Sequence, residues 1–126
     1  MDSPRLTLTA TVLGAPDPRV LADFYRRLLG WEIGTNESDW VTLRPRGGGA
    51  GLSFQTEDEH TPPVWPAGRD DQQMQLHLDI EVDDLEAGVS YALSAGATLA
   101  EFQPQDDVRV MIDPAGHPFC LWIATE

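Results

Sequence analysis

The stretch DPRVLADFYRRLLG, residues 17–30, has the pattern of a complete helix with a marked start and a marked end. Asp17 can cap the first turn, Pro18 suits the first helical position, and Gly30 can end the helix in a left-handed conformation. Apolar side chains recur between these ends at helical spacing, at Leu21, Phe24, Tyr25 and Leu28. The pattern predicts a helix with one apolar face.

The stretch DDLEAGVSYALSAG, residues 83–96, repeats this pattern 66 positions later in the chain (83 − 17). Asp83 and Glu86 resemble a capping box at the helix start, and Gly96 can end the helix. Tyr25 and Tyr91 occupy the same place in the two stretches. The second apolar face is predicted from Leu85, Val89, Ala92 and Leu93. Because 66 is just over half of 126 residues, the sequence indicates one small fold present twice.

Strand-like segments surround the two predicted helices. They cover residues 6–13, 31–36, 40–44 and 50–55 in the first half, and 74–82, 98–101, 108–113 and 118–123 in the second. Each half then has the order βαβββ. We therefore predict a single α+β domain over residues 1–126, with module one at about 5–56, a connecting loop at about 57–72 and module two at about 73–126. The loop is acidic, contains three prolines, and is long enough to serve as a lid.

The glycine-rich segment at residues 46–51 resembles a phosphate-binding loop only superficially. It lacks the Lys and the Ser or Thr that such a loop needs after its glycines, and it lies between two predicted strands. The segment therefore predicts the turn of a hairpin.

Composition bounds the class of protein. Hydrophobic residues make up 41% of the chain, which argues against disorder, and no apolar run approaches the roughly 20 residues of a membrane-spanning helix. The first residues show no charged segment followed by an apolar core, and there is one cysteine. We expect a soluble cytoplasmic protein that does not act at a membrane.

The net charge of −13 argues against a nucleic-acid partner, because phosphate binding needs clustered basic residues and the eight present are scattered. An acidic surface favours solubility, and it can also concentrate cationic ligands. Composition leaves both roles open.

Three segments of the second half carry a family resemblance: HLDIEVDDL at residues 77–85, GAT at 96–98 and DPAGHPFCLW at 113–122. They resemble the glyoxalase/bleomycin-resistance/extradiol-dioxygenase proteins of the vicinal oxygen chelate superfamily, and the residues from Phe24 to Trp31 resemble the matching place in its first half. The resemblance covers nearly the whole chain. It implies two βαβββ modules whose curved sheets form a cup for a ligand, with helices on the outer side, and it implies a homodimer.

The resemblance also implies where a catalytic metal would be bound, at one position on each of four strands. These positions correspond to Ala10 or Thr11, to Ser53, to His77 and to Cys120. Only His77 matches a ligand of the family, and even catalytic zinc sites use about three protein ligands. We therefore expect no metal and no other cofactor.

Strand alternation predicts the ligand-binding residues of the cup. On the fifth strand His77 and Asp79 share one face, where the carboxylate can orient the imidazole for acid–base chemistry or for gripping a ligand. The alternative is a solvated pair without chemistry. The other predicted ligand-binding residues are Ser53 and Gln55 on the fourth strand, Cys120 and Trp122 on the last strand, Trp40 on a strand and Trp65 in the loop.

Each of these predictions has a plainer alternative. Tryptophan offers a flat surface for stacking on a planar or cationic ligand, but it also serves in core packing. Cys120 has no basic neighbour in the sequence and is expected to be a packed thiol rather than a nucleophile. The orientation of the first strand stays open, because either the face with Ala10 or the face with Thr7, Thr9 and Thr11 can line the cup.

Two classes of function follow from the sequence. The first is a protein that binds a hydrophobic or aromatic small molecule without a metal, including sequestration of a drug or natural product as in bleomycin resistance. The second is a metal-independent enzyme, of lyase or isomerase type, that acts on a small carbonyl compound or a natural-product intermediate. In that enzyme His77 moves the proton and Asp79 orients His77. A purely structural or regulatory domain is a third alternative.

Overall fold

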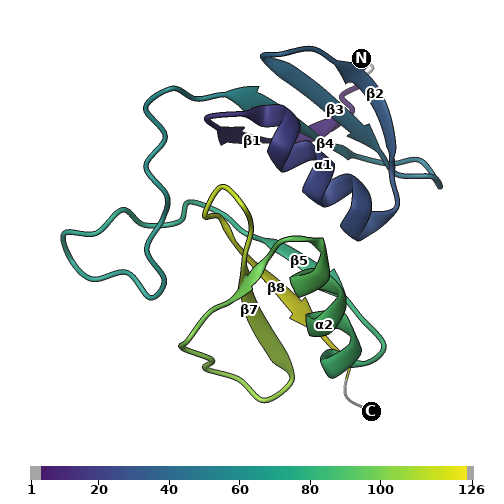
Figure 1. Ribbon diagram of the computed structural model, residues 1–126. Coiled ribbons are helices and arrows are strands. Elements are labelled where there is room, and N and C mark those ends of the chain that lie inside the picture. The colour runs from purple at the N-terminus through teal and green to yellow at the C-terminus, as the bar shows by residue number, and fades with distance from the viewer. Residues whose placement is uncertain (1–3, 125–126) are drawn as a thin grey trace. The chain divides into compact units, whose positions relative to one another are not determined.

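The computed structural model describes residues 4–124, which divide into two compact units between Asp58 and Glu59. Figure 1 shows a helix and a sheet in each unit, in the chain order βαβββ. The first unit contains module one and the second contains the connecting loop and module two. The predicted α+β class and the predicted order of elements are confirmed.

Module one is a four-stranded mixed sheet with one helix. Its strands lie in the order β1-β4-β3-β2, with β1 parallel to β4 and the other neighbours antiparallel. The elements are β1 (Ala10–Ala15), α1 (Pro18–Leu29), β2 (Glu32–Asn36), β3 (Trp40–Arg44) and β4 (Gly51–Thr56). The segment between β3 and β4 is the predicted hairpin turn.

Helix α1 has the predicted ends. The Asp17 carboxylate accepts a hydrogen bond of 3.1 Å from the backbone N–H of Arg19, and Gly30 has a left-handed backbone with φ of 70°. Tyr25 on the apolar face is fully buried, and its ring stacks on Phe54 of β4 with centroids 5.9 Å apart. This packing fixes which face of the sheet the helix covers.

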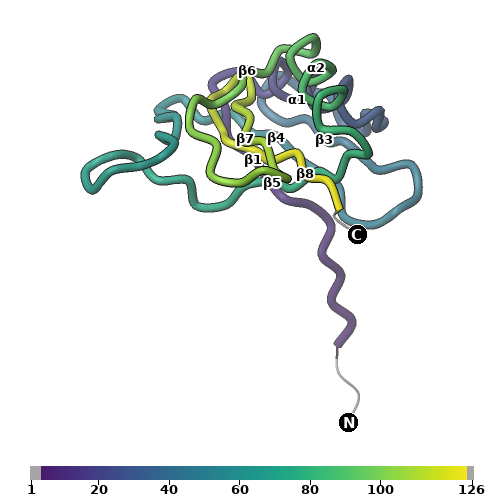
Figure 2. Tube along the Cα trace, turned by 90° about the horizontal axis from the view of Figure 1, so that it is seen from below, coloured from purple at the N-terminus to yellow at the C-terminus, as the bar shows by residue number. Residues whose placement is uncertain are grey.

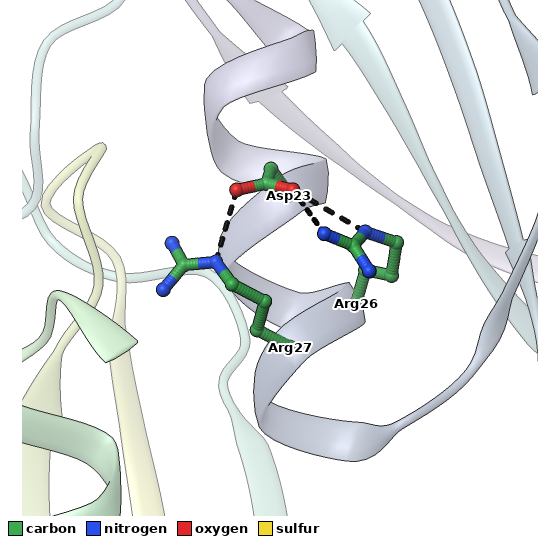
Figure 3. A network of polar contacts seen from close by, with 3 residues as sticks. All are labelled: Asp23, Arg26 and Arg27. Atoms are coloured by element: carbon green, nitrogen blue, oxygen red, sulfur yellow. Dashed lines mark hydrogen bonds and ion pairs between the residues drawn. The ribbon is translucent and has the colours of Figure 1, made fainter. Parts of the chain in front are cut away.

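An ion network lies on the exposed side of α1. Asp23 accepts hydrogen bonds from Arg26 Nη2 at 2.7 Å and from Arg27 Nε at 2.9 Å (Figure 3). The Arg26 hydrogen bond is the largest cause of a lowered pKa at Asp23, opposed by slight burial and supported by Arg27. Both guanidinium groups are therefore committed to Asp23.

Module two has the same plan with shorter elements. Its strands lie in the order β5-β8-β7-β6, with β5 parallel to β8 and the other neighbours antiparallel. The elements are β5 (Leu78–Glu81), α2 (Leu85–Ala95), β6 (Thr98–Leu99), β7 (Val108–Ile112) and β8 (Pro118–Trp122).

The start of α2 differs from the prediction by one residue. Asp84, rather than Asp83, caps the helix, because its carboxylate accepts a hydrogen bond of 3.0 Å from the N–H of Ala87. Tyr91 is 56% exposed, whereas its counterpart Tyr25 is 0% exposed. The two stretches therefore share their pattern of helix ends but not their packing.

Several predicted strands are shorter than expected, and of the strand expected at 98–101 only Thr98–Leu99 forms β6. The strand expected at residues 6–13 begins only at Ala10, because its partner β4 begins at Gly51 and the last hydrogen bond joins the Gly51 N–H to the Thr9 carbonyl. Leu6 and Leu8 are left 88% and 76% exposed. The strand expected at 74–82 covers only β5, because β8 offers four pairing residues.

The connecting loop is held within the second unit by side-chain contacts. His60 Nε2 lies 2.8 Å from the Ala115 carbonyl oxygen, and Trp65 Nε1 donates a hydrogen bond of 3.2 Å to the Phe102 carbonyl.

Within residues 4–124, no helix has both the length and the apolar composition needed to cross a membrane.

Candidate functional site

Module one has a hollow of about 520 Å³ on its sheet. It involves strands β1, β3 and β4, the turn between β3 and β4, and the segment that precedes β1. The lining residues are Thr7, Leu8, Thr9, Ala10, Thr35, Trp40, Thr42, Leu43, Arg44, Gly49, Gly51 and Ser53. All of them belong to the first compact unit.

Strand register explains why several of these side chains meet. Ser53 of β4 lies between Val12 of β1 and Thr42 of β3, so these three residues share the face opposite to buried Phe54 and Val41. Trp40 is two residues from Thr42 and therefore extends the same face. The helix covers one face of the sheet, and the hollow lies on the other.

The same register resolves the orientation of the first strand. Leu13 and Ala15 are 5% and 1% exposed, and Thr11 alternates with them onto the covered face. Ala10 and Val12 lie on the face of the hollow. Thr7 and Thr9, which precede β1, line the hollow as well, so both sets of residues contribute to it.

One hydrogen bond and one close approach of the backbone lie at the polar wall of the hollow. The Thr42 hydroxyl accepts a hydrogen bond of 2.8 Å from the N–H of Thr35. Gly34 lies beneath the Arg44 side chain, because a Cβ at Gly34 would stand 3.2 Å from Arg44 Nε and 2.6 Å from Thr42 Oγ1. A larger residue at this position would displace both side chains.

Module two brings together His77, Asp79 and Cys120. His77 Nε2 and Asp79 Oδ1 are 3.1 Å apart, and one ligand-type atom from each of the three residues lies within 4.8 Å of the others. Asp79 and Cys120 are direct neighbours in the β5–β8 ladder. The predicted pairing of His77 with Asp79 on one face is present.

The environment of Cys120 keeps its thiol protonated. Burial is the largest cause of a raised pKa, and the charge of Asp79 and its hydrogen bond with the thiol raise the pKa further. A protonated thiol is a poor nucleophile and a poor metal ligand.

The side chains do not fit the metal site that the resemblance implies. Ala10 has no donor atom, Thr11 lies on the covered face, and Ser53 offers only a hydroxyl. The three ligand-type residues of module two lie on β5, on β8 or directly before β5, so they come from two neighbouring strands and not from four. A ligand set spread over four strands is therefore lacking.

The predicted ligand-binding residues fall into separate groups. Trp40 and Ser53 line the hollow of module one, while exposed Gln55 lies opposite Trp40 on β4 but outside the lining. Trp122 is half-buried and shares a face of β8 with Cys120. The Trp65 ring lies against Phe102, with centroids 6.1 Å apart.

Sequence reasoning missed several residues of the hollow, among them the polar residues Thr35, Thr42 and Arg44. Alternation along the third predicted strand was a usable signal for two of them, because Trp40, Thr42 and Arg44 lie two residues apart. Thr35 had no such signal, because the register between β2 and β3 shifts between Ile33 and Asn36.

Comparisons with known proteins agree on the fold. No curated protein matches the chain in sequence. A glyoxalase/bleomycin resistance protein/dioxygenase family enzyme from Burkholderia phytofirmans PsJN has a similar structure, with a TM-score of 0.71, 19% identity and coverage of 95% of this chain and 100% of the other. A glyoxalase/bleomycin resistance protein/dioxygenase from Alicyclobacillus acidocaldarius has a TM-score of 0.62, 18% identity and coverage of 94% and 92%.

A third similar structure is an antibiotic binding protein from Streptomyces sp. CB03234, with a TM-score of 0.61, 17% identity and coverage of 98% of this chain and 100% of the other. At these identities the likeness concerns the fold alone. The sequence itself matches the model of the glyoxalase-like domain over residues 10–122. The match includes both βαβββ modules and nearly all of the chain, so the protein belongs to the glyoxalase-like domain family.

Proposed function

We propose that this protein binds a hydrophobic or aromatic small molecule without a metal ion, and that the hollow of module one takes part in binding. The observation that carries the proposal is the hollow itself. Its volume of about 520 Å³ lies within the range of small-molecule sites, and it combines an indole with several hydroxyl groups. Trp40 supplies a flat apolar surface, and Thr42 and Ser53 supply hydrogen-bonding groups.

The biological role proposed for this binding is sequestration of a drug or natural product by a cytoplasmic homodimer. The antibiotic binding protein among the similar structures supports this role by analogy of fold. The missing ligand positions support metal independence, because Ala10 has no donor atom and Ser53 offers only a hydroxyl.

Native mass spectrometry of the freshly purified protein is the first test. It reports the number of subunits, any stoichiometric metal and any co-purified organic molecule. A metal-free dimer with an organic adduct is expected. A stoichiometric metal that is lost from a His77→Ala variant would contradict metal independence.

A titration with naphthalene-2-carboxamide, a neutral aromatic probe, then tests the hollow. Trp40→Ala is expected to weaken binding about tenfold, since an aromatic stacking partner contributes roughly 0.5–1.5 kcal/mol beyond buried area. Trp31→Ala is the matched control, because Trp31 is also half-buried in module one but lies outside the lining. Equal losses for the two variants would indicate a general change in module one rather than a ligand contact.

The second candidate function is the metal-independent enzyme. The contact of 3.1 Å between His77 Nε2 and Asp79 Oδ1 favours it, because a carboxylate in that position can orient an imidazole for proton transfer. In this case His77→Ala should abolish turnover of the co-purified compound and change its affinity little. A sequestering protein has no turnover to lose, and Trp40→Ala should affect its ligand affinity more than His77→Ala does, because Trp40 lines the hollow and His77 does not.

A further inference from the structure

The charge of the module one hollow is opposite to the charge of the chain. The chain has 21 acidic and 8 basic residues, yet the lining includes Arg44 and, within residues 4–124, no Asp or Glu. A hollow with a guanidinium and without a lining carboxylate favours an anionic group over a cationic one. The cationic ligand that the overall charge suggests is therefore disfavoured at this place.

Arg44 is also available for a ligand. Its side chain makes no hydrogen bond or ion pair with another residue in the described range 4–124, although Glu32 lies opposite it in the β2–β3 ladder. Most other basic residues are already engaged. Arg19 bonds Asn36, Arg26 and Arg27 bond Asp23 (Figure 3), Arg46 bonds the Gly30 carbonyl, and Arg109 bonds three carbonyl groups.

The neighbouring hydroxyl groups complement Arg44. Thr42 Oγ1 accepts the N–H of Thr35, so its own proton can still be donated to a bound ligand. Ser53 is only 3% exposed and lies beside Thr42 in the β3–β4 ladder. A guanidinium and two hydroxyl groups on one sheet face are a donor set typical of carboxylate, sulfonate or phosphate recognition.

The remaining walls combine apolar and polar residues. Trp40 forms one of them, and Thr7, Leu8 and Thr9 form another. In Figure 2 the segment before β1 leaves the sheet of module one on the side away from α1, which is the side of the hollow. Leu8 is 76% exposed, so this wall has apolar surface to bury against a ligand.

We propose that the hollow of module one selects an aromatic anion, with Trp40 against the ring and Arg44 paired with the anionic group. The ligand class rests on the small-molecule binding proposed above and refines it. The volume of about 520 Å³ accommodates a molecule larger than a single ring, such as a polycyclic acid.

Three naphthalene probes with one ring system and different charges test the ligand class. They are naphthalene-2-carboxylate, the neutral naphthalene-2-carboxamide and the cationic naphthalen-2-ylmethylammonium, each titrated at pH 7 by calorimetry. The wild-type protein should bind the carboxylate most tightly. Arg44→Gln should lower the affinity for the carboxylate about threefold to tenfold, the range for a charge-assisted contact at an exposed site. Its affinity for the carboxamide should be nearly unchanged.

Arg46→Gln is the matched control. It removes the same charge from the same module, but Arg46 bonds the Gly30 carbonyl at 2.9 Å and does not line the hollow. An equal effect of both variants on the carboxylate would mean that only the net charge matters and would overturn the assignment of Arg44. A far-UV circular dichroism melt of each variant identifies any loss of fold.

The outcomes separate the ligand class from the proposed function. Binding of the three probes with equal affinity, or tightest binding of the cation, would refute the aromatic anion and leave small-molecule binding standing. If no probe binds but native mass spectrometry detects an organic adduct, the aromatic-anion proposal fails and small-molecule binding stands. If no probe binds and no adduct is found, both proposals fail.

Discussion

Replacing Gly51 by alanine should destabilise module one, because the structure leaves no room for a side chain there. Gly51 is the buried first residue of β4, and an added Cβ would overlap the backbone oxygen of Leu43 and lie 3.6 Å from Pro45 Cδ. The obstacle is the backbone of the neighbouring strand, so relief requires β3 and β4 to separate. We expect a loss of about 1–3 kcal/mol in the free energy of unfolding, the usual cost of overpacking.

Gly47→Ala is the control for this substitution. Gly47 belongs to the same glycine-rich turn, has no atom within 4 Å of an added Cβ, and does not have a positive φ. Its substitution should change stability by less than about 0.5 kcal/mol. Urea unfolding followed by circular dichroism should give a lower midpoint for Gly51→Ala alone, with a melting temperature lower by about 4 °C for each kcal/mol. Equal midpoints for Gly51→Ala and the wild type would refute the β3–β4 register.

Three further predictions concern carboxylates. Asp79→Asn should lower the pKa of Cys120, because the charge and the hydrogen bond of Asp79 both raise it; the pH dependence of iodoacetamide labelling of this single cysteine measures the change. Asp23→Asn should cost less than about 1 kcal/mol at pH 7, because Asp23 is half-exposed. The folded pKa of Asp23 is lowered, so the contribution of Asp23 to the free energy of unfolding is present above the unfolded value of 3.8 and is lost as pH falls through the folded value. The urea midpoints of the wild type and of Asp23→Asn should therefore converge between pH 7 and pH 2. Asp84→Ala should lower the free energy of unfolding by about 1 kcal/mol through loss of a helix cap, and Asp83→Ala should lower it clearly less. If thermal melts show the larger loss for Asp83→Ala, Asp83 is the cap, as the sequence predicted.

The sequence was sufficient to predict the helices because their signals are local. Asp17, Pro18 and Gly30 each act within one turn of α1, and the structure has all three in the predicted roles. The one-residue difference at α2 arises because two aspartates stand side by side. Only the position of the Ala87 N–H relative to Asp84 decides between them.

The strand ends and part of the site could not be predicted, because they depend on residues distant in the sequence. Ala10 begins β1 only because Gly51 is its partner, and Asp79 meets Cys120 only through the parallel β5–β8 pairing. Alternation did predict that Asp79 and Cys120 face the same way. The lack of a partner for the Arg44 guanidinium within residues 4–124 could not be anticipated, because the sequence does not show which arginines form hydrogen bonds or ion pairs.

The two modules share an order of elements but carry different chemistry on their sheets, and this makes the two candidate functions separable. The hollow of module one has an indole, hydroxyl groups and a guanidinium, which suit binding. Module two has an imidazole, a carboxylate and a protonated thiol, which suit proton transfer better than nucleophilic attack. Arg44→Gln and His77→Ala alter different sheets, so each can be measured against the other as a control. If the chain only binds, the response to aromatic anions should follow Arg44 and be insensitive to the protonation state of His77. If it catalyses, the pH profile of turnover should depend on His77 and Asp79 and persist in Arg44→Gln.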